Sequence, residues 1–324
     1  MKWNTKMMIL LMMMSTIMVM SSTNWMSMWI GMEINMVSFV PIMKMNNKES
    51  SSSTMMYFLA QSMGSSLFLY SLLSVWFQSP SNHSSMIMSM IMASMMIKMG
   101  LPPMHMWMII VMNNSSWTTC FMLMTWQKAA PMTVMSKISS MTNEMMMLAT
   151  TTTIIGAIGG INQTSIRKIM GYSSVSHMGW MLTMTTNNKW IIYLMIYSML
   201  TATMCFMMKS ESMFYLNQVC LTNKMNKMAL TINMLSMGGL PPMVGFLPKW
   251  MAIQTMINSN LTLIAMIMTM TSLITLMFYM SMIMPTMSLS TMTNKISIKK
   301  EKNYSWMIIL SMSTPVALTL NALI

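Results

Sequence analysis

Long apolar segments alternate along the chain with short stretches that are rich in Ser, Asn and Lys. A helix crosses the ~30 Å hydrocarbon core of a bilayer with about 20 apolar residues. The pattern therefore predicts an all-α polytopic membrane protein with eleven transmembrane helices. Their approximate limits are 7–24, 25–45, 55–77, 85–112, 117–136, 145–160, 166–186, 190–208, 228–257, 261–284 and 304–322.

Two of these helices are longer than a simple crossing and contain the same five residues, Gly-Leu-Pro-Pro-Met, at Gly100 to Met104 and at Gly239 to Met243. Paired prolines break a helix and free backbone groups that lipid cannot satisfy, so such breaks occur where they line a polar cavity or are covered by protein. A matched pair of broken helices in two halves of a membrane protein indicates a transport site. The helix-breaking residues are Gly100, Pro102, Pro103, Gly239, Pro241 and Pro242.

The basic residues orient the chain. With the N-terminus on one side of the membrane, thirteen of the 18 Lys and Arg residues fall on that side, two (Lys137 and Lys189) fall on the other, and three lie inside the helices. This bias places the N-terminus on the cytosol-equivalent face, which is the matrix for a mitochondrial protein, and the C-terminus on the opposite face. The thirteen are Lys2, Lys6, Lys44, Lys48, Arg167, Lys168, Lys209, Lys224, Lys227, Lys295, Lys299, Lys300 and Lys302.

The order of the helices predicts an internal repeat. Without the last helix, the other ten form two sets of five, and the fourth helix of each set is the broken one. An odd number of helices per set inverts the second set relative to the first, as in ion-coupled transporters. The expected parts are a first five-helix repeat over 1–140, a second over 141–285, and a loop with a C-terminal transmembrane helix over 286–324.

Composition agrees with this class of protein and excludes others. Apolar residues make up 55% of the 324 positions and charged residues 7%, against roughly 25% charged in a soluble domain. The net charge of +13 comes without a basic face or base-reading module, so we expect no nucleic-acid partner. The three cysteines, at 120, 205 and 220, have no metal-ligand spacing, and no zinc site or disulfide is assigned.

Methionine is unusually frequent, with 64 residues. Thioethers favour copper(I), but these residues are spread through every apolar segment without ligand-like spacing, so we expect no metal. Methionine here replaces Ile and Leu, as expected for an A+T-rich mitochondrial genome in which AUA encodes methionine. The composition therefore predicts a mitochondrially encoded protein.

Four ionisable residues lie near the middle of predicted helices: Glu33, Lys98, Lys128 and Lys249. Each such charge costs roughly 3 kcal/mol on insertion scales, so structure alone does not require them. Desolvation favours a neutral lysine and a nearby carboxylate favours a charged one, which suits a group that loads and releases a proton. We expect Lys128 in particular to sit mid-span in an unbroken helix. Lysines near helix ends, such as Lys44, are explained by snorkelling.

Two histidines are candidate relay residues. His105 follows the first break and His177 lies within a predicted helix among Ser residues, although a single histidine in a helix bundle is equally well a hydrogen-bonded packing residue. His83 is expected in a loop, and Glu144 is expected only to pair with Lys137.

Several segments together resemble a known family. From about residue 25 to 285, in order, the chain is similar to the chain 2 family of mitochondrial NADH–ubiquinone oxidoreductase, respiratory complex I, and to the related cation/proton antiporter subunits. The segments are Trp29-Ile-Gly-Met-Glu33-Ile-Asn35, Lys98-Met-Gly-Leu-Pro-Pro-Met-His105-Met-Trp107, Thr125-Trp-Gln-Lys128-Ala-Ala-Pro131, Gly159-Gly-Ile-Asn162-Gln-Thr-Ser-Ile-Arg167-Lys168, Tyr172-Ser-Ser-Val-Ser-His177-Met-Gly-Trp180 and Gly238-Gly-Leu-Pro-Pro-Met-Val-Gly-Phe-Leu-Pro-Lys249-Trp250.

The resemblance implies a membrane-arm subunit that moves protons across the inner mitochondrial membrane, driven by electron transfer from NADH to ubiquinone. Glu33 and Lys98 would form a switchable pair, Lys128 would carry the proton centrally, and Lys249 would be the terminal lysine. Many relatives have Pro-Glu after the His-x-Trp segment where this chain has Ile109-Ile110, so no role of that Glu is carried over.

The resemblance also implies the partners, which are other membrane-arm subunits, neighbouring antiporter-like subunits and lipids. The complex as a whole would use FMN, iron–sulfur clusters and ubiquinone, and none of these would be bound by this chain. Two alternatives remain open: a free-standing cation/proton antiporter with the same lysines, and a structural subunit whose charges only make lateral contacts.

Overall fold

The computed structural model describes residues 2–44, 48–77, 84–138, 142–216, 218 and 224–288. Over these residues the regular structure is helical, apart from an isolated bridge between Ser165 and Tyr215. The all-α prediction is confirmed for this part of the chain. The predicted helix over 304–322 lies outside the described residues. The chain forms two compact units, Met1–Met145 and Met146–Ile324, which are described separately.

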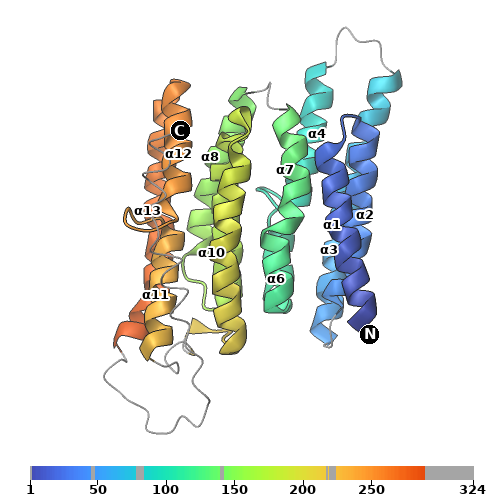
Figure 1. The fold of residues 1–324 in the computed structure, drawn as a ribbon. Helices are drawn as coiled ribbons and strands as arrows, with labels where there is room; N and C mark the ends of the chain where they lie inside the picture. The colour runs from blue at the N-terminus through green and yellow to red at the C-terminus, as the bar shows by residue number, and fades with distance from the viewer. Residues whose placement is uncertain are drawn as a thin grey trace. The chain divides into compact units, whose positions relative to one another are not determined.

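The first unit is built around the helix that carries Lys128, α7. Helix α7 contacts α1, α2, α4 and α6, while α3 packs against α2, α4 and α5 (Figure 1). The core of the unit therefore lies where α7, α4 and α3 meet. The bounds are α1 Lys2–Ser21, α2 Trp25–Met43, α3 Lys48–Phe77, α4 Ser84–Met99, α5 Met106–Asn114, α6 Trp117–Met124 and α7 Trp126–Ile138.

The second unit has α9 as its core helix. Every residue of α9 except Arg167 and Lys168 is buried, and the helix contacts α10, α12 and α13. Helix α13 also packs against α11 and α12, so α11 joins the bundle through α13. The bounds are α8 Thr142–Gly160, α9 Ile166–Thr183, the 3-10 turn η1 Thr185–Asn187, α10 Trp190–Ser210, α11 Lys224–Gly238, α12 Phe246–Asn258 and α13 Thr262–Ser288.

Both Gly-Leu-Pro-Pro-Met copies interrupt a helix in the same way. Helix α4 ends at Met99 and is followed by Gly100 with φ +68°, and α11 ends at Gly238 and is followed by Gly239 with φ +78°. In each case the next leucine N–H donates back to a carbonyl five residues earlier, Leu101 to Met96 (2.9 Å) and Leu240 to Leu235 (3.4 Å). This is the Schellman ending, in which glycine takes the left-handed position without steric cost. The prolines that follow cannot continue the helix.

The prediction of one unbroken helix over 117–136 was wrong. The structure divides it at Thr125, which has φ −117° and ψ −71°, into α6 and α7. The Thr125 hydroxyl donates to the carbonyl of Phe121 at 2.8 Å. Pro131 lacks an N–H, and its ring crowds the carbonyl of Gln127, so backbone bonding is weakened in the first turn of α7. Lys128 therefore lies beside a break.

Most buried Ser and Thr hydroxyl groups of the described helices form hydrogen bonds inside their own helices. Ser38 donates to the carbonyl of Asn35 at 2.9 Å, and Ser94 donates to the carbonyl of Ile91 at 2.7 Å. The same bond to the preceding turn is made by most described Ser and Thr residues in helices, for example Thr152 to Ala149 at 2.8 Å. This local bonding explains how apolar helices accommodate so many hydroxyl groups.

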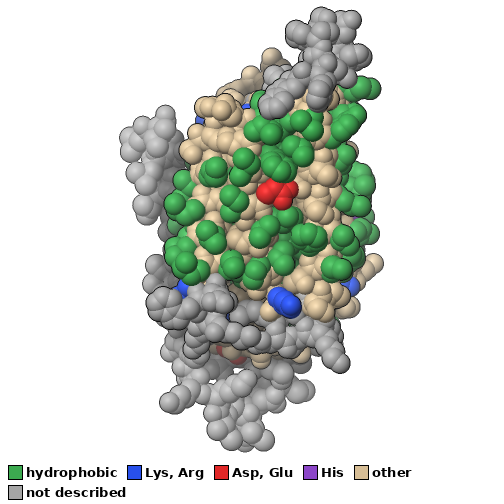
Figure 2. All heavy atoms as spheres, turned by 90° about the vertical axis from the view of Figure 1, so that its right-hand side faces the viewer, with side chains coloured by type: hydrophobic (Ala, Val, Ile, Leu, Met, Phe, Trp, Pro, Cys, Tyr) green, Lys and Arg blue, Asp and Glu red, His purple; other side chains and the backbone are tan. Residues whose placement is uncertain are grey.

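Within the described residues, three helical segments have the length and hydropathy of a full membrane crossing: Trp25–Met43, Trp190–Ser210 and Thr262–Met284. Two shorter apolar helices, Lys6–Ser21 and Met86–Met99, are below that length. The outer surfaces are apolar as well. On α13, Met266, Met270 and Met277 are each at least 65% exposed, and Figure 2 shows a face of the first unit covered by hydrophobic side chains. Such surfaces fit a lipid or subunit environment.

Candidate functional site

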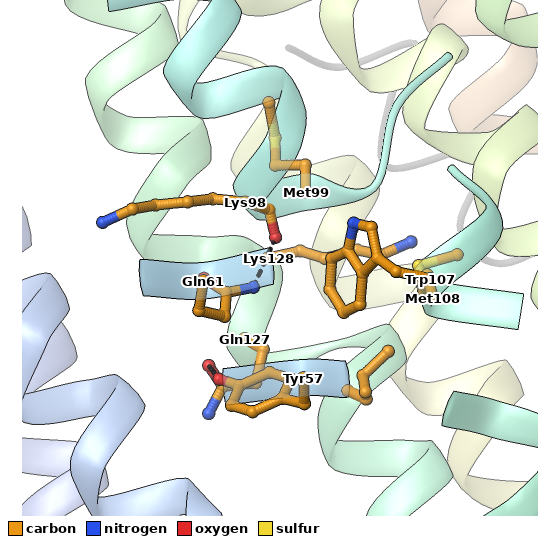
Figure 3. Close-up of a pocket in the computed structure, with 9 residues that line it drawn as sticks. Tyr57, Gln61, Lys98, Met99, Trp107, Met108, Gln127 and Lys128 are labelled. Carbon is orange, nitrogen blue, oxygen red and sulfur yellow. Dashed lines mark hydrogen bonds between the residues drawn. The ribbon is translucent and has the colours of Figure 1, made fainter. Parts of the chain in front are cut away.

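Lys98 and Lys128 line one small cavity inside the first unit, which we call the lysine cavity (Figure 3). Its volume is about 10 Å³, room for about one water molecule. In Figure 3 the side chain of Lys98 extends away from Trp107 and that of Lys128 extends toward it. The lining residues are Tyr57, Gln61, Lys98, Met99, Trp107, Met108, Leu123, Gln127 and Lys128.

Lys98 is buried in the last turn of α4, directly before the first break. Its backbone carbonyl, one of those left without a helical partner at a helix end, accepts a hydrogen bond from Gln61 Nε2 at 2.9 Å. The carbonyl of Ile97 accepts from Trp107 Nε1 at 3.0 Å. Side chains of α3 and α5 therefore hold the C-terminal end of α4 and fix the position of the Lys98 backbone.

Glu33 is half-buried on α2, close to Lys98. The ammonium of Lys98 lies 3.8 Å from the sulfur of Met32, the residue before Glu33, and the charge of Glu33 acts on Lys98. Beside Glu33 on the helix surface, Ile30, Ile34 and Val37 are 42%, 39% and 60% exposed. The face of the first unit in Figure 2 shows an acidic side chain surrounded by hydrophobic ones.

Lys128 is 2% exposed and is the third residue of α7. Its backbone N–H donates to the carbonyl of Thr125 at 3.2 Å, across the break. Of the predicted residues, the structure thus brings Lys98 and Lys128 to one cavity and Glu33 near Lys98. His105 is not among the lining residues. It is half-buried in the loop before α5, and its Nδ1 lies 3.3 Å from the carbonyl oxygen of Pro103.

Four polar residues around the lysine cavity were not predicted as site residues: Asn35, Tyr57, Gln61 and Gln127. Tyr57 donates to Gln127 Oε1 at 3.2 Å, and Gln127 Nε2 donates to Asn35 Oδ1 at 3.1 Å. Each is an uncharged polar residue inside an apolar segment. The chain has many such residues, so polarity by itself could not have selected these four.

Lys249 belongs to the second unit, where it closes the second broken helix. It is 5% exposed in the first turn of α12, and its Nζ donates to the carbonyl of Gly238, the last residue of α11, at 2.7 Å. A side chain at Gly239 would lie 3.0 Å from this nitrogen. The lysine therefore occupies the space next to the break and satisfies a carbonyl that the break leaves free.

His177 lies at the centre of a buried aromatic cluster in the second unit. Its Nδ1 is 2.8 Å from the hydroxyl of Tyr193, and its ring centroid is 4.9 Å from that of Tyr197. The hydroxyls of Tyr197 and Tyr279 are buried without a hydrogen-bond partner among the described residues. The cluster therefore buries several polar side-chain groups within an apolar core.

No group of three or more His, Cys, Asp or Glu side chains that could hold a metal ion occurs in the described part of the chain. Cys120 and Cys205 are both buried and not in a disulfide. The polar groups at the lysine cavity include lysine, amide and hydroxyl groups, with the carboxylate of Glu33 close to Lys98.

Comparison with known proteins identifies the family. The family model described as "NADH:quinone oxidoreductase/Mrp antiporter, TM" matches residues 22–275. The protein named NADH-ubiquinone oxidoreductase chain 2 of Locusta migratoria is 41% identical over 280 residues, covering 83% of this chain and 81% of the relative. Its namesake in Anopheles gambiae is 39% identical and covers 82% and 80%. The chain belongs to the NADH-ubiquinone oxidoreductase chain 2 family.

Membership of the chain 2 family confirms the resemblance inferred from the sequence motifs. The mammalian member from Canis lupus is 36% identical over 320 residues and covers 92% of this chain. Among solved structures, a chain of respiratory complex I from Thermus thermophilus superposes with a TM-score of 0.83 at 17% identity, covering 97% of this chain and 77% of that chain. A chain of the Mrp complex from Dietzia sp. gives 0.76 at 13% identity, covering 93% and 63%. At these identities the structural matches show the shared fold.

Proposed function

We propose that this chain is an antiporter-like subunit of the membrane arm of respiratory complex I, and that it translocates protons across the inner mitochondrial membrane when electrons pass from NADH to ubiquinone. The observation that carries the proposal is the lysine cavity. Two buried lysines from different helices share a space for about one water molecule, one directly before a helix break and the other directly after one.

The proton would pass along four groups. Glu33 and Lys98 act as the switchable pair, because a carboxylate that approaches an ammonium stabilises the charged form and one that withdraws releases it. Lys128 receives and releases the proton centrally, and Lys249 is the terminal lysine. Lys128 lies in the first turn of α7, where part of the backbone hydrogen bonding of a helix is missing. His105 and His177 are candidate relay residues.

The proposed architecture is eleven transmembrane helices, with two inverted five-helix repeats over 1–140 and 141–285 and a C-terminal helix within 286–324. The two breaks support it, since each is a Gly-Leu-Pro-Pro turn with the glycine at positive φ. In each unit a buried lysine lies next to the break, Lys98 on its N-terminal side and Lys249 on its C-terminal side.

The orientation can be tested with terminal tags. We expect a tag at the N-terminus to be protected from protease added to intact mitoplasts, and a tag at the C-terminus to be cut, because eleven helices would place thirteen basic residues on the N-terminal side and two on the other. Detergent lysis should expose both tags and serves as the control. Both termini on one face would exclude an odd number of helices and, with it, the inverted repeat.

The proposed partners are the other membrane-arm subunits, including neighbouring antiporter-like subunits, together with lipids. The apolar outer surface beside Glu33 supports a lateral partner on that side, because a carboxylate facing lipid costs several kcal/mol. FMN, iron–sulfur clusters and ubiquinone would be used by the complex in its other subunits, so this chain would contribute proton movement without covalent chemistry of its own.

A free-standing cation/proton antiporter is the second candidate, favoured by the matching family model, whose description includes the Mrp antiporter. Native gel electrophoresis of solubilised mitochondrial membranes separates the two. We expect the chain to co-migrate with NADH dehydrogenase activity in a large assembly. A smaller oligomer without that activity would favour the free-standing antiporter and exclude the proposed subunit.

A further inference from the structure

A line of side-chain hydrogen bonds crosses the first unit from α2 through α7 to α3. Gln127 is its centre and uses both ends of its amide: Nε2 donates to Asn35 on α2, and Oε1 accepts from the hydroxyl of Tyr57 on α3. Tyr57 is 1% exposed and Asn35 4%, so both partners are fixed in the core. Gln127 therefore ties the beginning of α7 to two other helices.

The hydrogen bonds of Gln127 lie at the beginning of α7, where the backbone of the helix has the fewest hydrogen bonds of its own. Gln127 is the second residue of α7 and follows the break at Thr125, and the first turn of a helix lacks part of its backbone hydrogen bonding. The rotation of this turn decides where the next residue, Lys128, points. Side-chain bonds to α2 and α3 supply the restraint that the backbone lacks.

The same face of α3 also forms a hydrogen bond with α4, the helix that carries Lys98. Gln61 is one turn after Tyr57 on α3, and residues four apart lie on one helix face. Gln61 donates to the backbone carbonyl of Lys98, and Tyr57 reaches Lys128 through Gln127. In Figure 3 the labelled Tyr57, Gln61 and Gln127 lie around the lysine cavity. Helix α3 thus helps to position both α4 and α7, the helices that carry Lys98 and Lys128.

We propose that Gln127 is a positioning residue for proton transfer between Lys98 and Lys128, acting through the placement of Lys128. The inference rests on the proposed function. Its amide also adds a polar group to the wall of a cavity with room for about one water molecule, and a buried water needs two to four polar partners. The carboxamide does not titrate, so it keeps its charge state throughout.

The test compares Gln127→Met, Lys128→Met and the double variant in the intact complex, reconstituted into proteoliposomes. The readouts are assembly on native gels and protons translocated per NADH oxidised. Methionine keeps the length of glutamine but leaves Asn35 and Tyr57 without their partner. We expect Gln127→Met to assemble and to lower the proton yield severalfold, and the double variant to be no lower than Lys128→Met. Residues that act through one another give such non-additive effects.

The matched control is Gln254→Met, which changes an exposed glutamine of α12 and should leave the proton yield unchanged. Tyr57→Phe removes a single hydroxyl from the same line and should lower the yield in the same direction. If Gln127→Met does not assemble, Tyr57→Phe becomes the deciding variant. An unchanged proton yield in Tyr57→Phe would then overturn the inference.

The outcomes distinguish this inference from the proposed function. A full proton yield in Lys128→Met would overturn the proposed function and the inference that rests on it. Loss of yield in Lys128→Met with a full yield in Gln127→Met would overturn the inference alone. A double variant well below Lys128→Met would show that Gln127 acts independently of Lys128, which also overturns it.

Discussion

Replacing Lys128 by methionine will produce a complex that assembles well but translocates few protons per NADH oxidised. Lys128 is 2% exposed, and removing a charge from the membrane interior improves the local transfer free energy by roughly 3 kcal/mol, so folding should not suffer. The group proposed to carry the proton is lost, and transfer through this subunit should stop. The measurement is protons translocated per NADH oxidised in proteoliposomes, compared with the amount of assembled complex on native gels.

Lys128→Arg distinguishes a proton carrier from a fixed positive charge. A guanidinium remains protonated in proteins and cannot release its proton, so we expect this variant to fail as Lys128→Met does. The control is Lys189→Met, which removes an exposed lysine immediately before α10 and should have no effect. Full proton yield with arginine at this position would mean that Lys128 supplies only a positive charge and that the proton takes another route.

The second large effect is expected from Glu33→Gln. The substitution keeps the size of the side chain and removes the charge that acts on Lys98, so the proposed Glu33–Lys98 pair loses one of its two states. We expect the complex to assemble while NADH oxidation and the proton release coupled to it fall severalfold. Both rates are measured in the same membranes, with and without an uncoupler.

Glu144→Gln is the matched control, because Glu144 is exposed in the first turn of α8. It should leave oxidation and proton release unchanged. If Glu33→Gln behaves like this control, the carboxylate is dispensable and the proton must be controlled by lysines alone.

Local rules were sufficient for the broken helices, because the signal is contained in five consecutive residues. The Gly-Leu-Pro-Pro-Met copies predicted breaks at the places where α4 and α11 end. Glycine is the residue that enters the left-handed region without steric cost, and proline cannot continue a helix, so no distant contact is needed. The break at Thr125 was missed because neither glycine nor proline stands there, and Pro131 lies more than one turn away.

The lysines show a second limit of sequence reasoning. Their unusual position was visible from the chain, since a charge in the middle of an apolar segment is costly. Their surroundings were not. Gln61, which holds the carbonyl of Lys98, is 37 residues away from it, and Gln127 is 92 residues from Asn35. Many polar residues in this chain have the same local character, and packing alone selects the ones that meet.

By itself, the sequence determined the helical class, the positions of the Gly-Leu-Pro-Pro breaks and the family. The class and the breaks depend on residues that are close together in the chain, and the family on several short motifs in a fixed order. Only the tertiary structure decided that Lys98 and Lys128 share one cavity, that Lys249 closes the end of α11, and that α7 begins at a break. These depend on how helices pack and rotate against one another, and the apolar surfaces of such helices are nearly uniform in hydrophobicity. Packing geometry and a few hydrogen bonds between distant residues therefore determine how the helices are placed and rotated against one another.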